Sequence, residues 1–574
     1  MPRLRKVVSA VVVLQALWAP QVGWAQQDSS PIETEEPFLD VVDVEIVNID
    51  VWVTRKDGSP LEGLGRDDFV VSRDGEPVEI TNFYAVSGGR PVPTATEPSG
   101  IDGMTTPDRQ PMAKLEVAPE HRLWLIVFID NFNIDPIERN RVLPDIERFL
   151  RRNLSIGDQT MLVTYDRTLE VRQPFTDRIG LLTETLRSIQ DESGLASIRQ
   201  REQFDTLKLI DDADDAFQAL GYARQYAEEQ LNSVGYSVDA LDRLIDSLAG
   251  LPGRKALLHV SSGVPMLAGE EMFHAVAEKF SRTDVYSEIP RYDSSRGFER
   301  VSRRANANRV AFHTLDAGGL RGFRFGAAEY GGFVDTDLRS TLDSVVPENL
   351  QSSLRLMAIE TGGRAILNRN EILPALIEVS RDFRSFYSLG ISAAGADSGR
   401  YHEIKVRLKE RPKGARLRHR SGYRSKDMRT RMRESLQAAL SYAHQDNPLD
   451  IQLRWGRLEP HNEKNLYVLP LEIHVPMRDV ALLPISTERH EARLELYVGA
   501  VGEDGKSSEI NQAPLGLRLA NEHVEAARAE SLLHTHKLLL KRGRQKVGVA
   551  ILDVFGGQSS IVTEFIEVAT QPAD

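Results

Sequence analysis

The sequence predicts an α/β protein with a doubly wound, mostly parallel sheet, a flanking β-strand domain and a C-terminal β-sandwich. Three short apolar runs, Leu123–Ile129, Ala256–Val260 and Val310–Leu315, are typical of parallel strands that helices bury on both faces. Stretches of helical periodicity separate these runs, and this alternation indicates one mostly parallel sheet. Strands that alternate apolar and polar residues lie on either side of this region, which favours antiparallel sheets there.

The composition excludes several classes of protein. The chain has 574 residues, a length that predicts roughly two to four domains. Its 71 Lys and Arg residues are outnumbered by 84 Asp and Glu residues, and the net charge of −13 argues against a general nucleic-acid binder. Cysteine is absent from the sequence, which excludes disulfides, thiolate catalysis and cysteine metal sites.

The N-terminus has the pattern of a secretory signal peptide. Arg3, Arg5 and Lys6 precede the apolar stretch Val7–Trp18, and small residues lead to a cleavage position after Ala25. No later run approaches the roughly 18 apolar residues of a membrane-spanning helix. We therefore expect an exported protein, periplasmic or extracellular, without a transmembrane segment after signal cleavage.

The remaining parts follow from changes in periodicity and composition. Asp74-Gly75 marks a hairpin turn in the first β segment, and Ile404, Val406 and Leu408 alternate with cations in a later one. Each segment has too few strands to stand alone, so we expect the two to pair. The predicted order is a signal peptide (1–25), a flexible lead-in (26–38), an N-terminal β unit (39–86), a linker (87–118), the α/β domain (119–383) with a polar, irregular insertion near 281–305, the pairing β strands (384–424), a helical connector (425–449) and an immunoglobulin-like β-sandwich (450–574).

Several short motifs carry a family resemblance. They are D-G-x-P-x-x-G-L-x-x-x-D-F and D-G-x-P-x-x-I-x-x-F within residues 51–83, Leu251–Ala256 followed by Ser261–Gly263, Thr361–Arg364, Tyr387–Gly390 and Arg420–Tyr423. In this order the motifs resemble bacterial von Willebrand factor A-related proteins of the type found in Acidobacteria, over roughly residues 40 to 424. The resemblance implies a von Willebrand factor A fold and a role in binding, such as adhesion, rather than catalysis.

The resemblance also implies a metal-ion-dependent adhesion site, which this sequence matches only in part. The family pattern is D-x-S-x-S after the first strand, a Thr from a second loop and an Asp after a later strand. Asp130 matches the first Asp, but Phe132 and Ile134 replace the two serines, and Ser262 stands where the later Asp is expected. The resemblance therefore implies a degenerate metal site. A Mg²⁺ or Ca²⁺ ion would need Asp130, Asp135, Ser237 and Ser262 as its oxygen ligands, with Asn133 as a further substitute.

The ends of the three buried strands supply the candidate binding residues. Because ligands collect beyond the carboxyl ends of parallel strands, Asp130, Asn133, Ser262 and Asp316 are expected at one edge of the sheet. Two structural alternatives stay open: Asp130 as a helix-capping acid, and Asp316 as the residue that turns the chain before Gly318-Gly319.

Four other groups of polar residues are weaker candidates for functional sites. His534 and His536 share one face of a strand but lack a third zinc ligand. Asp211, Asp212, Asp214 and Asp215 lack the spacing of a calcium loop, and we expect them to form a solvated helix face. The basic run Arg400–Arg433 could dock an anionic polymer or lipid headgroup, or serve as a solvated face. A hydrolytic site at Asp130 would need a histidine or a second carboxylate, for which Asp166 is the candidate.

The sequence thus predicts an exported, non-enzymatic, adhesion-type protein that binds an unknown protein or envelope polymer through its α/β domain. No nucleic-acid partner and no cofactor are expected. The alternatives are Mg²⁺- or Ca²⁺-dependent binding around Asp130 and, less favoured, hydrolase activity.

Overall fold

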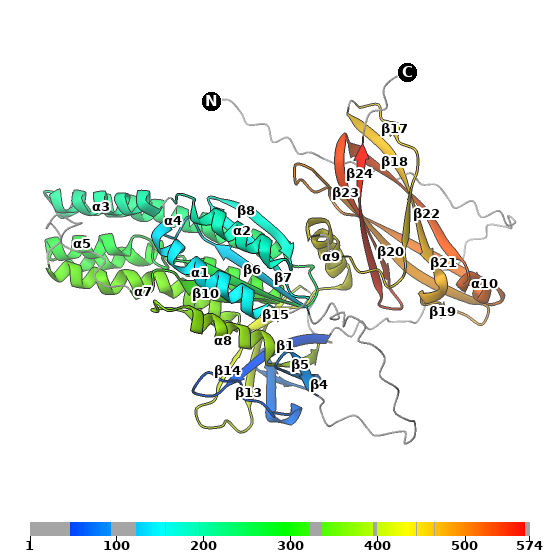
Figure 1. The fold of residues 1–574 in the computed structure, drawn as a ribbon, viewed down its shortest axis with the longest axis horizontal. Helices are drawn as coiled ribbons and strands as arrows, with labels where there is room; N and C mark the ends of the chain where they lie inside the picture. The colour runs from blue at the N-terminus through cyan, green and yellow to red at the C-terminus, as the bar shows by residue number, and fades with distance from the viewer. Residues whose placement is uncertain are drawn as a thin grey trace. The chain divides into compact units, whose positions relative to one another are not determined.

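The computed structural model describes residues 46–92, 122–154, 157–194, 196–320, 336–393, 399–442, 445–463 and 465–568 (Figure 1). Contacts divide the chain into two units, one of residues 44–248 and 252–425 and one made mainly of residues 426–574. The predicted signal peptide and lead-in, and residues 93–118 of the predicted linker, lie outside the described residues.

The first unit contains a six-stranded mixed sheet in the order β11-β10-β9-β6-β7-β8. The strands are β6 (Leu123–Ile129), β7 (Gln159–Asp166), β8 (Thr168–Thr176), β9 (Arg254–Ser261), β10 (Val310–Asp316) and β11 (Ala365–Ile366). Every neighbouring pair is parallel except β7 with β8. All seven residues of β6 are buried, as expected for a central parallel strand.

Helices pack on this sheet and extend beyond it. They are α1 (Pro136–Asn153), α2 (Ile179–Gln190), α3 (Ala196–Asp212), α4 (Ala216–Ser247), α5 (Glu270–Phe280), η3 (Thr283–Tyr292), α6 (Ser295–Ala307), α7 (Thr336–Glu360) and α8 (Leu373–Arg384). Apolar residues of α1, α2 and α8 form one core with those of β6, β9 and β10. A second core joins α3, α4, α5, η3 and α7, which Figure 1 shows as a group of helices reaching past the sheet.

Two stretches differ from the sequence prediction. Residues 281–305, expected to be an irregular insertion, instead form η3 and α6. Phe298, Val301 and Ala305 lie three and four residues apart and are buried on one face of α6, a helical spacing hidden by the arginines between them. The acidic run is also more than a solvated face, because the carboxylate of Asp215 caps α4 by accepting hydrogen bonds from two backbone N–H groups.

The strands on either side of the α/β sheet pair with each other, as their shortness predicted. Residues 46–92 form β1 (Ile46–Thr54), β2 (Phe69–Arg73), β3 (Glu76–Val78), β4 (Ile80–Ser87) and β5 (Arg90–Val92), and residues 386–424 form β12 (Phe386–Ser392), β13 (Tyr401–Leu408), β14 (Arg416–His419) and β15 (Gly422–Arg424). The two antiparallel sheets, β14-β1-β12-β4-β5 and β15-β13-β2-β3, share one apolar core. We call residues 46–92 and 386–424 the flank module; β5 extends it into the segment predicted as linker.

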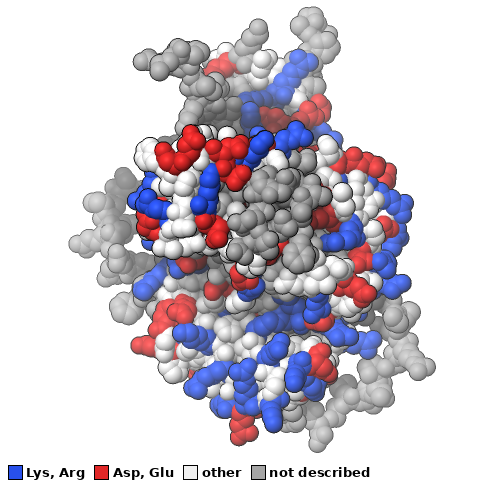
Figure 2. Space-filling model, turned by 90° about the vertical axis from the view of Figure 1, so that its left-hand side faces the viewer, with Lys and Arg blue, Asp and Glu red and all other residues white. Residues whose placement is uncertain are grey.

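The flank module carries much of the basic run. Lys405 and Arg407 point outward from β13, whereas the alternate residues Ile404, Val406 and Leu408 are buried. In Figure 2, Lys and Arg side chains gather on the lower part of the face, where the flank module lies.

The second unit consists of a helix and two antiparallel sheets. Helix α9 (Met428–Tyr442) precedes one sheet of β16 (Gln452–Trp455), β17 (Glu459–Pro460), β18 (Leu466–Pro476) and β22 (Ser531–Lys541). The other sheet contains β19 (Leu483–Pro484), β20 (Arg489–Gly502), β21 (Asn511–Ala520), β23 (Gly543–Asp553) and β24 (Ser559–Val568), and α10 (Val524–Arg528) lies between β21 and β22 in the chain. Buried residues of both sheets, including Leu471 and Leu496, form one core.

Candidate functional site

The strand order reverses between β6 and β9, and the carboxyl ends of these two strands are where a parallel α/β sheet forms a binding crevice. From β6 the chain adds β7 and β8 on one side and then returns to add β9 and β10 on the other. Parallel α/β sheets bind ligands where the order reverses in this way. Asp130 follows β6, Ser261 ends β9 and Asp316 ends β10 directly opposite Ser261. The three predicted strand ends therefore lie at one edge.

Asp130 is buried and held by hydrogen bonds. Asp130 is 1% exposed. Oδ1 accepts a hydrogen bond from the backbone N–H of Asn133 (3.1 Å), and Oδ2 accepts from Nδ2 of Asn133 (2.8 Å) and from the hydroxyl of Ser261 (3.1 Å). The carboxylate thus stabilises the turn after β6 and tethers it to the end of β9.

Asn133 connects this buried carboxylate to the helices. Its Nδ2 also donates to Oγ of Ser237 on α4 (3.2 Å), and its Oδ1 accepts a hydrogen bond from the guanidinium of Arg199 on α3 (2.7 Å). The same guanidinium lies 4.6 Å from the ring centroid of Phe132. The Arg199 guanidinium therefore lies over Phe132, one of the two residues that stand where the D-x-S-x-S pattern has serine.

Ser262 and Asp135 lie beside Asp130 but have other partners. The hydroxyl of Ser262 donates to the carboxylate of Glu138 in the first turn of α1, and Asp135 caps α1 by accepting from the N–H of Ile137 (2.8 Å). The serine that contacts Asp130 is Ser261, not the predicted Ser262. The last residue of β9 faces the neighbouring strand end, while the next residue turns its side chain towards α1.

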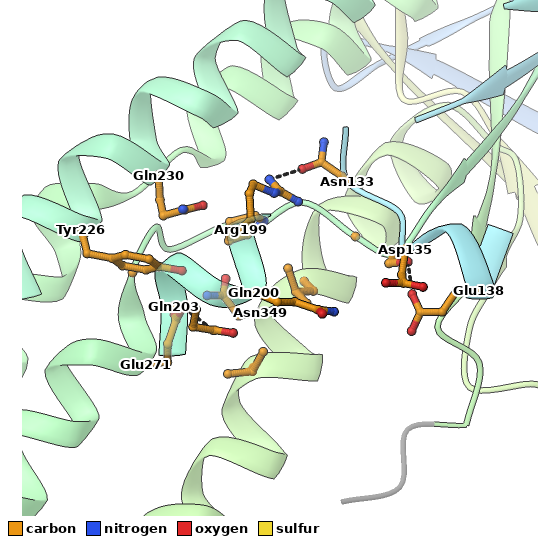
Figure 3. Close-up of a pocket in the computed structure, with 16 residues that line it drawn as sticks. Asn133, Asp135, Glu138, Arg199, Gln200, Gln203, Tyr226, Gln230, Glu271 and Asn349 are labelled. Carbon is orange, nitrogen blue, oxygen red and sulfur yellow. Dashed lines mark hydrogen bonds between the residues drawn. The ribbon is translucent and has the colours of Figure 1, made fainter. Parts of the chain in front are cut away.

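A small polar pocket opens next to these residues (Figure 3). Its volume is about 90 Å³. Asp135 and Glu138 lie on one side, Gln203, Tyr226, Gln230 and Glu271 lie on the other, and Arg199 lies between them (Figure 3). We call it the strand-edge pocket. It is far smaller than the roughly 300 to 1,000 Å³ of cofactor and metabolite sites, but it can accept one side chain of a partner.

The far wall of the strand-edge pocket is buried and carries hydrogen-bonding side chains. Burial raises the pKa of the Glu271 carboxyl, which accepts a hydrogen bond from Nε2 of Gln203 (2.8 Å). Burial, together with the nearby Glu271, raises the pKa of Tyr226 well above its usual value. Glu271 and Tyr226 offer hydrogen bonds to an occupant, and Arg199, Asp135 and Glu138 are charged groups on the other parts of the wall.

The residues at this edge do not fit a divalent cation. Asp130 already accepts three hydrogen bonds, and Asn133 Oδ1, the nearest amide oxygen, is bound by the positively charged Arg199. Of the predicted ligand set, Asp130 and Ser237 both accept hydrogen bonds from Nδ2 of Asn133, whereas Asp135 and Ser262 bind the N–H of Ile137 and the carboxylate of Glu138 instead. In the part of the chain that the structure describes, no three His, Asp or Glu side chains are placed to hold a metal.

The structure brings a histidine to Asp130 that the sequence reasoning missed. Nε2 of His259, a residue with no exposed surface, lies 3.5 Å from Oδ2 of Asp130. The sequence does offer a sign of this contact: His259 lies two residues before Ser261, so its side chain is on the same face of β9, and it pairs with Phe128 near the end of β6. Asp166 is an exposed residue at the end of β7, and partial desolvation of its carboxyl raises its pKa. No hydrogen bond joins Asp166 to Asp130 among the described residues, so the predicted hydrolytic pair is not formed.

The remaining predicted residues have structural partners. Asp316 accepts hydrogen bonds from the N–H of Gly318 (2.9 Å) and from Nε2 of Gln351 (2.8 Å), which matches a turn-forming role. The rings of His534 and His536 are 6.2 Å apart on β22. Burial lowers the pKa of both, that of His536 to about 4, so both are neutral at physiological pH.

Within the described residues, no helix has the length and apolar character to cross a membrane.

Comparisons with known proteins give weak similarity only. No family model and no curated protein match the chain. Among solved structures, the chain is similar to a mutant of the PilB minor pilin from Streptococcus sanguinis at 8% identity and a TM-score of 0.27, over 46% of this chain and 61% of that one. It is similar to the vWF domain of the type V pili tip protein Mfa5 from Porphyromonas gingivalis at 12% identity and a TM-score of 0.23, over 45% and 94%. It is also similar to a von Willebrand factor type A protein from Catenulispora acidiphila at 9% identity and a TM-score of 0.22, over 78% and 65%. These neighbours include von Willebrand factor A domains, but at such TM-scores a functional proposal has to rest on the residues of the site.

Proposed function

We propose that this chain is an exported, adhesion-type binding protein whose α/β domain binds another protein or an envelope polymer without a metal and without catalysing a reaction. In this proposal the domain has a doubly wound, von Willebrand factor A-like fold, and the second unit is a β-sandwich that acts as a further module. The apolar core shared by the two sheets of the second unit supports that assignment.

The observation that carries the proposal is the hydrogen bond between Arg199 and Asn133 at the edge of the strand-edge pocket. The guanidinium binds the amide oxygen of Asn133, one of the oxygens that a divalent cation here would need as a ligand. The pocket beside it has room for a side chain but not for a metabolite. Its charged groups, Arg199, Asp135 and Glu138, would recognise a polar or charged partner side chain by charge-assisted hydrogen bonds.

A role in binding is also supported by the burial of the groups that hydrolysis would need. Asp130 and His259 are 1% and 0% exposed. A substrate has to come within hydrogen-bond distance of a catalytic acid or base. Here the carboxylate of Asp130 is surrounded by protein donors instead.

The metal dependence is tested by thermal unfolding and calorimetric titration of the full chain with Mg²⁺, Ca²⁺ and Mn²⁺. We expect no heat of binding and the same melting temperature in each metal as in EDTA. A metal-dependent rise in melting temperature that disappears in Asp130→Ala would overturn the metal-free proposal in favour of metal-dependent adhesion.

Binding through the strand-edge pocket is tested by capture from envelope extract on the immobilised full chain, followed by identification of the captured molecule and measurement of its affinity. Asp135→Asn with Glu138→Gln removes two pocket charges and keeps the helix cap and the acceptor for Ser262. We expect at least a roughly tenfold loss of affinity, and no effect of EDTA. The matched control, Asp177→Asn with Glu184→Gln, removes two exposed charges outside the pocket and should bind like the wild type. Equal affinity of both double variants would exclude this pocket.

A further inference from the structure

A second concave surface lies between the flank module and the α/β sheet. It has a volume of about 870 Å³ and is lined by the end of β1, by β11 with the residues around it, by α8, and by β14 with the loop before it. We call it the cationic groove. All of these elements belong to the first unit. The cationic groove is separate from the strand-edge pocket, and no residue lines both.

Positive charge dominates the cationic groove although the chain as a whole is acidic. Seven of its lining residues are Lys or Arg, and two, Asp57 and Glu378, are acidic. The buried carboxylate of Asp382 lies behind the lining and binds Arg364 and Arg418. Seven cations thus face three carboxylates, which leaves a surplus of four positive charges in a protein with a net charge of −13.

The surplus comes from side chains that are available to a ligand. Lys56, Arg369 and Arg416 are exposed, and none of them forms an ion pair with any residue that the structure describes. They belong to three different parts of the wall: the turn after β1, the loop after β11, and β14. The backbone of Arg416 is held by strand pairing with Thr54 of β1. Cations from separate walls suit a ligand that carries several spaced negative charges rather than one compact anion.

Arg364 and Arg418 give the groove a rigid floor. Nε of Arg364 and Nη2 of Arg418 lie 2.6 Å and 2.7 Å from Oδ2 of Asp382, and Nη1 of Arg364 lies 3.0 Å from Glu378. Arg418 also donates to the carbonyl groups of Gly362 and Gly363 (both 3.0 Å). This network joins α8, the residues just before β11, and β14, so the unpaired cations lie on a preorganised surface, which lowers the entropy cost of binding.

Apolar side chains complete the lining. Ile359 is 64% exposed, and Ile366, Leu367, Ala375 and Leu417 also line the groove. Apolar patches between cations match a chain of sugar rings, whose C–H faces need apolar contact while their anionic groups need cations. A bilayer presents its headgroups in a plane and would meet only the rim of a groove.

We propose that the cationic groove binds a segment of an anionic polysaccharide, with Lys56, Arg369 and Arg416 contacting its acidic groups. Recognition would use the bidentate geometry of the guanidinium towards carboxylate or sulfate. Because it concerns a different surface, this proposal stands or falls independently of the strand-edge pocket.

The test measures the fluorescence anisotropy of labelled heparin oligosaccharides on titration with the full chain at about 50 mM and about 300 mM salt. We expect binding at low salt that weakens at high salt, and no binding of neutral dextran. The triple variant Lys56→Ala, Arg369→Ala, Arg416→Ala should bind heparin about tenfold more weakly or worse. The matched triple variant Arg407→Ala, Lys409→Ala, Arg424→Ala removes the same charge from exposed positions outside the groove and should stay within about twofold of the wild type.

A second measurement uses the wild-type chain and so does not depend on the folding of a variant. Heparin should slow hydrogen–deuterium exchange at residues 54–58 and 411–418. The proposal is overturned by no heparin binding at low salt, by equal weakening in both triple variants, or by protection confined to other segments. It is also overturned if vesicles containing phosphatidylglycerol bind the groove and heparin does not.

Discussion

The guanidinium of Arg199 donates a hydrogen bond of 2.7 Å to Oδ1 of Asn133, the residue whose amide and backbone N–H groups hold the carboxylate of Asp130. Through this chain of contacts, a helix outside the sheet fixes the turn at the centre of the sheet edge.

Replacement of Arg199 by Ala should therefore affect both stability and binding. Loss of the hydrogen bond and of the contact with Phe132 should lower the free energy of unfolding by about 1–2 kcal/mol, as measured by urea unfolding. The amount of partner captured should fall to background, because the central charge of the pocket is gone. Arg201→Ala removes an exposed arginine from the same helix and should change neither quantity. An Arg199→Ala chain that captures its partner normally would contradict the proposed role.

The convergence of Asp130, Asp316 and the serines after β9 could be predicted from sequence, because parallel strands that end in polar residues must present those residues at one edge. Which serine contacts Asp130 could not. A shift of one residue reverses the direction of a side chain, and a single sequence does not fix where β9 ends. Hence Ser262 was selected where Ser261 makes the contact.

Arg199, Gln203 and Glu271 were not predicted because their place depends on how α3 and α5 pack, not on any local motif. The pairing of the two flank segments was predictable because strands with one apolar face require a partner sheet. The helix α6 was missed because its five charged residues outnumber its three buried apolar residues.

Gly263 should tolerate no side chain. Its φ is +97°, and a Cβ there would lie 2.5 Å from the carbonyl oxygen of Leu350, a backbone atom that cannot move aside easily. Gly263→Ala should cost about 2–4 kcal/mol through backbone strain and overpacking, and it should distort the strand-edge pocket that both residues line. Urea unfolding measures the cost. Gly235 lies in α4 with open space around it, so Gly235→Ala should instead stabilise the chain by about 0.5–1 kcal/mol. Similar effects of the two substitutions would refute this account.

Asp382 should be needed for the stability of the first unit. Burial raises its pKa, but Arg418 and Arg364 outweigh burial, and the net pKa of the carboxyl lies below its usual value. Asp382→Asn would leave two arginines without their buried counter-charge, at an expected cost of about 3–5 kcal/mol near neutral pH. A lowered carboxyl pKa gives stability above the unfolded pKa of about 3.9 and loses it as the pH falls through the folded pKa. The difference between wild type and variant in urea unfolding should therefore shrink below about pH 4. Glu378→Gln, at a more exposed partner of Arg364, should cost about 1 kcal/mol or less.

His313 should make the first unit sensitive to acid. The ring is 1% exposed and packs edge-on against Phe383 at 5.5 Å. Burial lowers its pKa to about 3; the nearby Asp382 opposes this shift, and Arg418 and Arg364 add to it. The unfolded chain binds a proton near pH 6.5, whereas the folded chain does not until about pH 3, so acid favours the unfolded state between these values.

The stability that His313 contributes by staying neutral is complete above about pH 6.5 and is lost progressively below it. Between pH 7.5 and pH 4.5 the wild type should lose roughly 3 kcal/mol more than His313→Gln, whose side chain does not titrate. Urea unfolding of both chains at the two pH values measures this difference, and the comparison cancels the effects of all other titrating groups. Because Gln cannot fill the ring's space, the variant will be less stable at neutral pH, but only the change with pH reports on the histidine. Parallel pH dependences of the two chains would show that His313 takes up its proton in the folded protein as readily as in the unfolded chain.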